Sequence, residues 1–182
     1  MPIIREFDFV GHRIRSPYLR LLFDYWEKLR RGRAAPDASD VDALDIPVTA
    51  LPFVILVDLE RDPVRARYRL VGTHSSTVAG WDYTGKYVHE IEMPNTRIDE
   101  IMEDFSYALD MKPMYAIYKW PLRDDRGVVD VEMIQLPLLE NGVVTRCFCG
   151  EHVVLDDDLH FEDMSPIFRI PQSLTAGPHS DR

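Results

Sequence analysis

Cysteines and long apolar runs are scarce in this chain of 182 residues, and basic residues are fewer than acidic ones. Asp and Glu number 31 against 21 Lys and Arg, which gives a formal net charge of −10. A surface this acidic disfavours binding to nucleic acid or to an anionic membrane. No apolar run approaches the roughly 20 residues of a membrane-spanning helix, and the N-terminus has no basic stretch followed by an apolar one. We therefore expect a cytoplasmic protein with no nucleic-acid or membrane partner.

The chain has two cysteines, Cys147 and Cys149. In a strand they would share one face, and neighbours two apart in a strand rarely form a disulfide. His152 is close in sequence, but alternation puts it on the opposite face, and zinc usually takes four ligands. The sequence therefore predicts neither a disulfide framework nor a metal site.

The composition does support a packed domain, because 46% of the residues are hydrophobic. Ser16 and Pro17 predict a helix start, since Ser caps a helix and Pro is tolerated at its first position. Gly32 is expected to end that helix. Large apolar side chains three or four residues apart form a stripe along it: Leu19, Leu22, Trp26 and Leu29. We assign residues 1–50 to this N-terminal helical cap and to a wrapping loop that follows it.

Residues 51–155 are predicted to form an α+β core. Residues 51–59 are nearly all apolar, which is typical of a buried strand, and residues 65–72 alternate as a second strand. The remaining elements are a helical insert over 74–112, clearest at 96–111, and strands over 113–121, 128–138 and 142–155, joined by turns at 124–127 and 140–142. This order predicts a five-stranded antiparallel sheet with short helices on one face. Residues 156–182 are expected to form a tail with a disordered end.

Two motifs stand together near the middle of the chain. Residues 67–73 read Arg-Tyr-Arg-Leu-Val-Gly-Thr, and residues 82–86 read Asp-Tyr-Thr-Gly-Lys. We expect the backbone to require Gly72 and Gly85, with a positive φ at Gly85. A strand, a short helical link and a second turn suggest a cup closed over a sheet, which is more typical of ligand sensors than of enzymes.

With these motifs, and with Tyr25-Trp26 and Asp45-Ile-Pro47 before them, the chain resembles the PAS sensor fold. More closely, it resembles a proteobacterial family of small proteins that consist of a single PAS domain, over residues 18–155 or so. The resemblance implies a PAS core behind an N-terminal helical cap. It implies no activity, because PAS domains bind very different ligands or none. A flavin-adduct cysteine would be expected in the helical insert, which contains no Cys, so the cofactor stays unknown.

A PAS-like cavity would lie between the sheet and the short helices. We expect Asp130 and Glu132 to face water, and alternation then turns Val131, Met133 and Gln135 inward. Gln135 would be a polar group on an apolar face and would need a partner. The candidate ligand-binding residues are Tyr68, Tyr115, Met133, Gln135 and Cys147. The alternative is a filled core whose polar atoms bond to the backbone.

The outward-facing residues of the same strand are also apolar. Such an apolar face is expected to be covered, either by the leading helix or by a second subunit. The candidate interface residues are those of the helix stripe: Leu19, Leu22, Trp26 and Leu29.

These features favour a non-enzymatic sensory or regulatory protein that binds a small organic molecule, a protein partner or both in signal transduction. No kinase, cyclase or DNA-binding module is visible, so we expect output through a signalling partner or a homodimer. No catalytic residue is predicted. Two alternatives stay open. One is a small enzyme with a cone-shaped α+β fold, which would need an Asp/His pair in its cavity. The other is a structural dimeric adaptor that binds no ligand.

Overall fold

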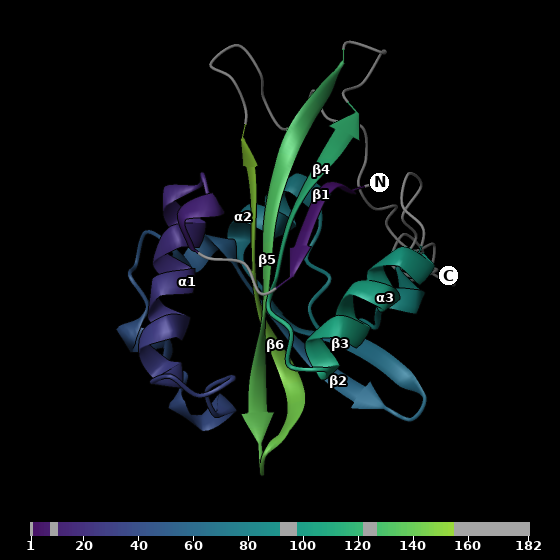
Figure 1. The fold of residues 1–182 in the computed structure, drawn as a ribbon. Helices are drawn as coiled ribbons and strands as arrows, with labels where there is room; N and C mark the ends of the chain where they lie inside the picture. Colours follow the sequence, from purple (N-terminus) through teal and green to yellow (C-terminus); the bar gives the residue numbers. More distant parts are fainter. Residues whose placement is uncertain (1, 8–10, 92–97, 122–126, 155–182) are drawn as a thin grey trace, which may run out of the picture.

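The computed structural model describes residues 2–7, 11–91, 98–121 and 127–154 (Figure 1). The predicted tail at 156–182 lies outside the described residues, as does most of the predicted turn at 124–127. Three α-helices and six strands are present in the described ranges. Among these residues, no helix is long and apolar enough to cross a membrane.

The strands form one antiparallel sheet with the order β1-β4-β5-β6-β2-β3. Their bounds are β1 Pro2–Phe7, β2 Val54–Arg61, β3 Val64–Val71, β4 Met114–Pro121, β5 Val128–Glu140 and β6 Val143–Val154. The α+β class and the antiparallel sheet are confirmed, but the sheet has six strands rather than five.

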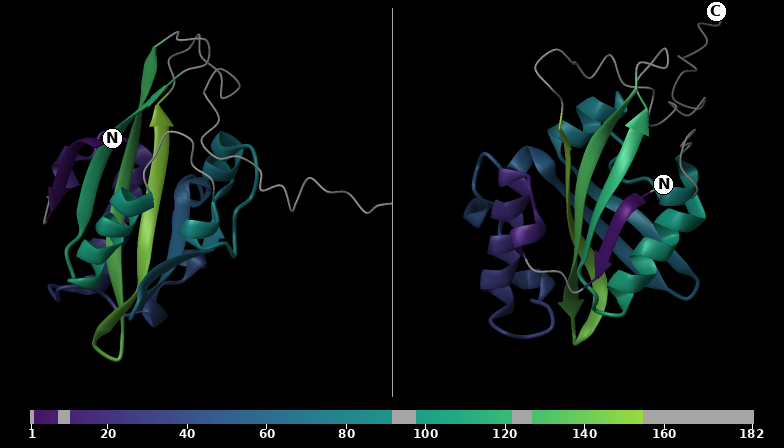
Figure 2. Two further views of the ribbon diagram at one scale, coloured as in Figure 1. Left: turned by 90° about the vertical axis from the view of Figure 1, so that its right-hand side faces the viewer. Right: turned by 45° about the horizontal axis from the view of Figure 1, so that its top comes forward.

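The additional strand is β1, which pairs with β4 at the edge of the sheet (Figures 1 and 2). Its sequence, Pro-Ile-Ile-Arg-Glu-Phe, has no regular alternation of apolar and polar residues. A distant pairing partner decides its conformation, so no local pattern announces it. The first 50 residues are therefore not a separate cap, because they contribute a strand to the core sheet.

The short helices of the insert lie on one face of the sheet, as expected, and the leading helix lies on the other face (Figures 1 and 2). The α1 helix, Pro17–Arg30, covers one face, while α2, Thr73–Ala79, and α3, Ile98–Leu109, cover the other. Short 3₁₀ turns occur at Gly11–Arg13, Ala38–Asp40, Ala43–Asp45, Leu51–Phe53 and Val88–Glu90. The molecule thus has three layers, with one apolar core on each side of the sheet.

The start and end of α1 follow the predicted signals. The Ser16 hydroxyl accepts a hydrogen bond of 3.2 Å from the Leu19 N–H, and Pro17 is the first helical residue. At the other end, Arg31 and Gly32 both have a positive φ, of 50° and 79°. A left-handed residue pair of this kind ends a helix.

The stripe on α1 packs against the sheet of its own chain. Leu19 and Leu22 are fully buried, and the Trp26 indole N–H donates a hydrogen bond of 3.0 Å to the Pro137 carbonyl. The same core contains the outward-facing β5 residues Ile134, Leu136 and Leu138. Of the two covers considered for this face, the leading helix is the one observed. The stripe, including the partly buried Leu29, is used within the chain and does not form an exposed subunit interface.

The wrapping loop at 33–48 packs against the same layer. The Leu139 N–H donates to the Pro36 carbonyl at 2.9 Å, and the Tyr25 hydroxyl bonds both backbone groups of Asp42, at 2.9 and 3.1 Å. These contacts hold the loop against α1 and the end of β5.

Candidate functional site: a cavity between the sheet and α3

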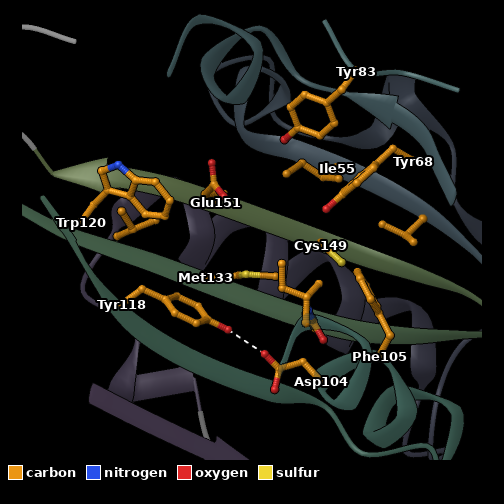
Figure 3. Close-up of a pocket in the computed structure, with 14 residues that line it drawn as sticks. Ile55, Tyr68, Tyr83, Asp104, Phe105, Tyr118, Trp120, Met133, Cys149 and Glu151 are labelled. Carbon is orange, nitrogen blue, oxygen red and sulfur yellow. Dashed lines mark hydrogen bonds between the residues drawn. The ribbon is translucent and has the colours of Figure 1, made fainter. Parts of the chain in front are cut away.

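A cavity of about 100 Å³ lies on the face of the sheet that carries α2 and α3, which we call the cavity face. Side chains from β2 to β6, from α3 and from the segment after α2 project into one space (Figure 3). The lining residues are Ile55, Val57, Tyr68, Tyr83, Ile101, Asp104, Phe105, Tyr118, Trp120, Val131, Met133, Gln135, Cys149 and Glu151.

Strand register explains why the sheet residues meet at this cavity. Met133 is paired with Glu151, and Gln135 with Cys149. Directly paired residues of an antiparallel sheet point to the same face. Alternate residues of β5 and β6 therefore form the floor of the cavity, and the inward orientation predicted for Val131, Met133 and Gln135 is what the structure shows.

Gln135 is fully buried at the cavity wall. Within the described part of the chain, neither its amide nitrogen nor its amide oxygen has a hydrogen-bond partner. The partner that the sequence led us to expect is therefore not supplied by these residues. Buried amide groups are nearly always bonded, so this side chain is an exception that needs a cause.

Asp104 reaches the cavity from α3 and is already partnered. Its carboxylate accepts a hydrogen bond of 2.8 Å from the Tyr118 hydroxyl (Figure 3) and forms an ion pair of 2.8 Å with Arg5. Burial raises the pKa of Asp104, while the Tyr118 and Arg5 contacts lower it. This cluster joins α3 to β4 and to the edge strand β1.

Glu151 is the second carboxyl group on the wall. It forms no ion pair with any described residue. Burial raises its pKa to about 7, and the nearby Ser75 hydroxyl on α2 opposes the rise. A carboxyl group in this state exchanges a proton close to neutral pH.

Two of the five candidate ligand-binding residues do not line the cavity. Tyr115 is paired with Ile134 and so points to the face covered by α1, which we call the α1 face. Both faces of this part of β4 are buried, so alternation alone could not choose between Tyr115 and Tyr118. Cys147 is on the cavity face, but Cys149, two residues on, is the cysteine that lines the cavity.

Glu132 corrects a second expectation, because it does not face water. It is 2% exposed and lies on the α1 face. Its carboxylate accepts hydrogen bonds from the backbone N–H groups of Arg15 and Ser16, at 2.6 and 2.7 Å, and from the Tyr115 hydroxyl at 2.8 Å. These three donors compensate the burial of the charge.

Several wall residues were not identified from the sequence. Glu151 could have been found, because it shares a strand face with Cys149 by simple alternation. Asp104 and Phe105 follow Ile101 by three and four residues, which is the spacing of one helix face. The others not identified are Ile55, Val57, Tyr83, Tyr118 and Trp120.

Both cysteines are free and buried. His152 lies on the opposite face, where its ring contacts Tyr18 and Phe53 at centroid distances of 5.3 and 5.0 Å. In the described ranges, no group of three or more His, Cys, Asp or Glu side chains is arranged to hold a metal ion.

The sequence model of a family described as PAS domain matches residues 14–150. No curated protein and no solved structure matches the chain.

Proposed function

The chain belongs to the PAS domain family, and on that premise we propose that it is a sensory or regulatory protein that binds a small, largely apolar organic molecule in the cavity. Family membership supports the general sensory or regulatory role. The ligand is argued from the cavity itself.

The observation that carries this proposal is the buried carboxamide of Gln135, which has no hydrogen-bond partner among the residues that the structure describes. Leaving a buried donor or acceptor without a partner costs about 1–3 kcal/mol per group. Gln135 offers one acceptor and two N–H donors at the cavity wall. A bound molecule with one or two polar atoms would satisfy this side chain and remove the cost.

The size and lining of the cavity limit the ligand further. The volume of about 100 Å³ is smaller than the roughly 150 Å³ of a cavity that admits benzene, so the part of a ligand that the cavity holds is no larger than a single ring. Aromatic and aliphatic side chains form most of the wall, which is typical of pockets for apolar molecules. Neither Lys nor Arg is among the described residues that line it, so a nucleotide would find no counter-charge.

The two alternatives fit the cavity less well. An enzyme with a cone-shaped fold would need an Asp/His pair in the cavity, and no histidine is among its described lining residues. An adaptor with a filled core would have no space of this volume and no unsatisfied amide facing it. The ligand-binding sensor accounts for both features.

Native mass spectrometry of the full chain, purified without refolding, tests the proposal, because it reports retained ligand and subunit number together. A thermal-shift screen of one-ring organic molecules follows. We expect Gln135→Leu to weaken the binding of any hit, and Tyr115→Phe, which removes a hydroxyl on the opposite face, to leave it unchanged. Binding that is equally sensitive to both variants, or to neither, would place the ligand outside this cavity.

We further propose that ligand binding is passed to a signalling partner or to a second copy of the chain. The expected homodimer is tested by light scattering of the chain with and without a hit from the screen. If the mass equals that of one chain at all concentrations, with and without ligand, the homodimer is excluded and the signal must pass to a different protein.

A further inference from the structure

We propose that the cavity selects a molecule with a single positive charge, an organic ammonium, with Glu151 as its counter-ion. This inference rests on the proposed function, since it names the chemical class of the ligand for the same cavity. It begins with the charges on the wall, which are two carboxyl groups, Asp104 and Glu151, with no Lys or Arg in the described lining. A wall of this kind excludes anions.

The two carboxyl groups differ in what they already bind. Asp104 is held by Arg5 and by Tyr118, each at 2.8 Å. Glu151 lies near the neutral Ser75 hydroxyl but has no ion-pair partner among the described residues, although it lines the cavity. Of the two, Glu151 is therefore the carboxyl group available to a ligand.

The rest of the wall suits a cation with an apolar body. Five aromatic side chains line the cavity: Tyr68, Tyr83, Phe105, Tyr118 and Trp120. Tyr68 and Tyr83 meet edge to face, with ring centroids 4.7 Å apart. Ring faces attract ammonium groups, and a desolvated cation near several rings gains more than an exposed one. A neutral molecule would gain only the apolar contact.

Gln135 supplies a second polar contact at a defined separation. It is paired with Cys149, whereas Glu151 is paired with Met133, so Gln135 and Glu151 are diagonal neighbours on the cavity face. Diagonal neighbours in an antiparallel sheet lie about 7–8 Å apart. A ligand with its ammonium near Glu151 and a ring-sized body would reach the amide of Gln135, which the described residues leave without a hydrogen-bond partner.

The ionisation of Glu151 makes the proposal dependent on pH. Its pKa is raised to about 7 by burial, so it carries its charge mainly above neutral pH. The other ionisable groups that line the cavity are Asp104 of α3, Tyr68 of β3, Tyr83, Tyr118 of β4 and Cys149 of β6. Burial raises the pKa of the three tyrosines and of the thiol, which keeps them neutral, and Asp104 is held by Arg5. A cation that needs ionised Glu151 should bind about tenfold more tightly at pH 8 than at pH 6.

The test uses three probes of similar size and different charge: benzylamine, benzyl alcohol and benzoate. Isothermal titration calorimetry of the full chain at pH 8 should show benzylamine binding at least about tenfold more tightly than benzyl alcohol, and benzoate binding most weakly. At pH 6 the advantage of benzylamine over benzyl alcohol should fall by about tenfold. These measurements need no variant.

Glu151→Gln provides the matched variant, because it keeps the size and polarity of the side chain and removes the charge. We expect it to abolish the advantage of benzylamine over benzyl alcohol, which is measured as the ratio of the two affinities in the same variant. Equal binding of benzylamine and benzyl alcohol, or an advantage that survives Glu151→Gln, would overturn the cation inference and leave the cavity as a site for neutral molecules. Failure of all three probes to bind the wild-type chain would count against the cavity as a ligand site altogether.

Discussion

The hydroxyl of Tyr115 donates a hydrogen bond of 2.8 Å to the carboxylate of Glu132 across β4 and β5. The same carboxylate receives the backbone N–H groups of Arg15 and Ser16, immediately before α1. A single buried carboxylate therefore joins the middle of the sheet to the start of the leading helix. Negative charge is favourable at a helix N-terminus, which strengthens the connection.

We predict that Glu132→Ala lowers the free energy of unfolding by about 2–4 kcal/mol, because two buried donors and one partly buried donor lose their acceptor. Tyr115→Phe removes one hydrogen bond to a charged group and should cost about 1–2 kcal/mol. Urea denaturation measures both values. Glu140→Ala, at an exposed carboxylate on the same strand, is the control and should change stability by less than about 0.5 kcal/mol. Equal effects at Glu132 and Glu140 would contradict this account.

Trp26 tests the packing between α1 and the sheet. It is 2% exposed and bonds the Pro137 carbonyl. Trp26→Ala should lower the free energy of unfolding by about 3–5 kcal/mol, and Trp26→Phe, which keeps most of the apolar area, should cost less. Leu44→Ala, at a residue that is 91% exposed, is the control. A wild-type melting temperature for Trp26→Ala would mean that the helix is not docked as described.

Gly72 and Gly85 are both required by the backbone, but for different reasons. Gly85 has a φ of 86° and open space where a Cβ would lie, whereas a Cβ on Gly72 would overlap the Pro52 carbonyl oxygen. Gly85→Ala should therefore cost about 1 kcal/mol from strain alone. Gly72→Ala should cost more, since backbone atoms must move. Thermal unfolding shows which of the two variants has the lower melting temperature. A lower melting temperature for Gly85→Ala than for Gly72→Ala would contradict this prediction.

Much of this fold could be predicted from the sequence because its signals are local. Ser16, the stripe on α1 and the alternation of β5 each act within a few residues, and the helices and strands built on them are present. What could not be predicted depends on distant pairing. β1 is a strand only because β4 lies beside it, and Tyr115 was assigned to the wrong face because β4 is buried on both sides. Glu132 was placed in water because charged residues are usually exposed, and its three donors come from segments that the sequence did not bring together.

The stability of the protein should depend on pH through Glu151. Its pKa rises from an ordinary 4.5 to about 7 in the folded state, so the folded protein binds this proton more tightly than the unfolded chain. Binding of this proton adds its full contribution to the free energy of unfolding below about pH 4.5, and the contribution is lost as the pH rises to about 7. We expect wild type to lose up to about 3 kcal/mol relative to Glu151→Gln between pH 4.5 and pH 8.

Urea denaturation of both proteins across this range measures the difference. His74, whose pKa is lowered from 6.5 to about 4 by burial and by His152, gives a contribution of the opposite sign. The stability that neutral His74 contributes is lost as the pH falls from about 6.5 to about 4. Because this loss is the same in wild type and in Glu151→Gln, it cancels when the two proteins are compared. Parallel curves for wild type and Glu151→Gln would show that Glu151 titrates normally.

Gln135 gives the last prediction, which concerns the protein without ligand. Its amide is fully buried, and in the described part of the chain it has no partner, so replacing it with an apolar side chain of similar size removes an uncompensated cost. We expect Gln135→Leu to raise the free energy of unfolding of the ligand-free chain by about 1–2 kcal/mol. Met133→Leu, a volume-conserving change at the same wall, is the control and should lower it by less than about 1.5 kcal/mol. If Gln135→Leu is instead less stable than wild type, the amide is hydrogen-bonded in the ligand-free protein and is not available to a ligand. If the variant is more stable without ligand and also binds the ligand more weakly, then Gln135 lowers the stability of the folded chain and raises its affinity for the ligand.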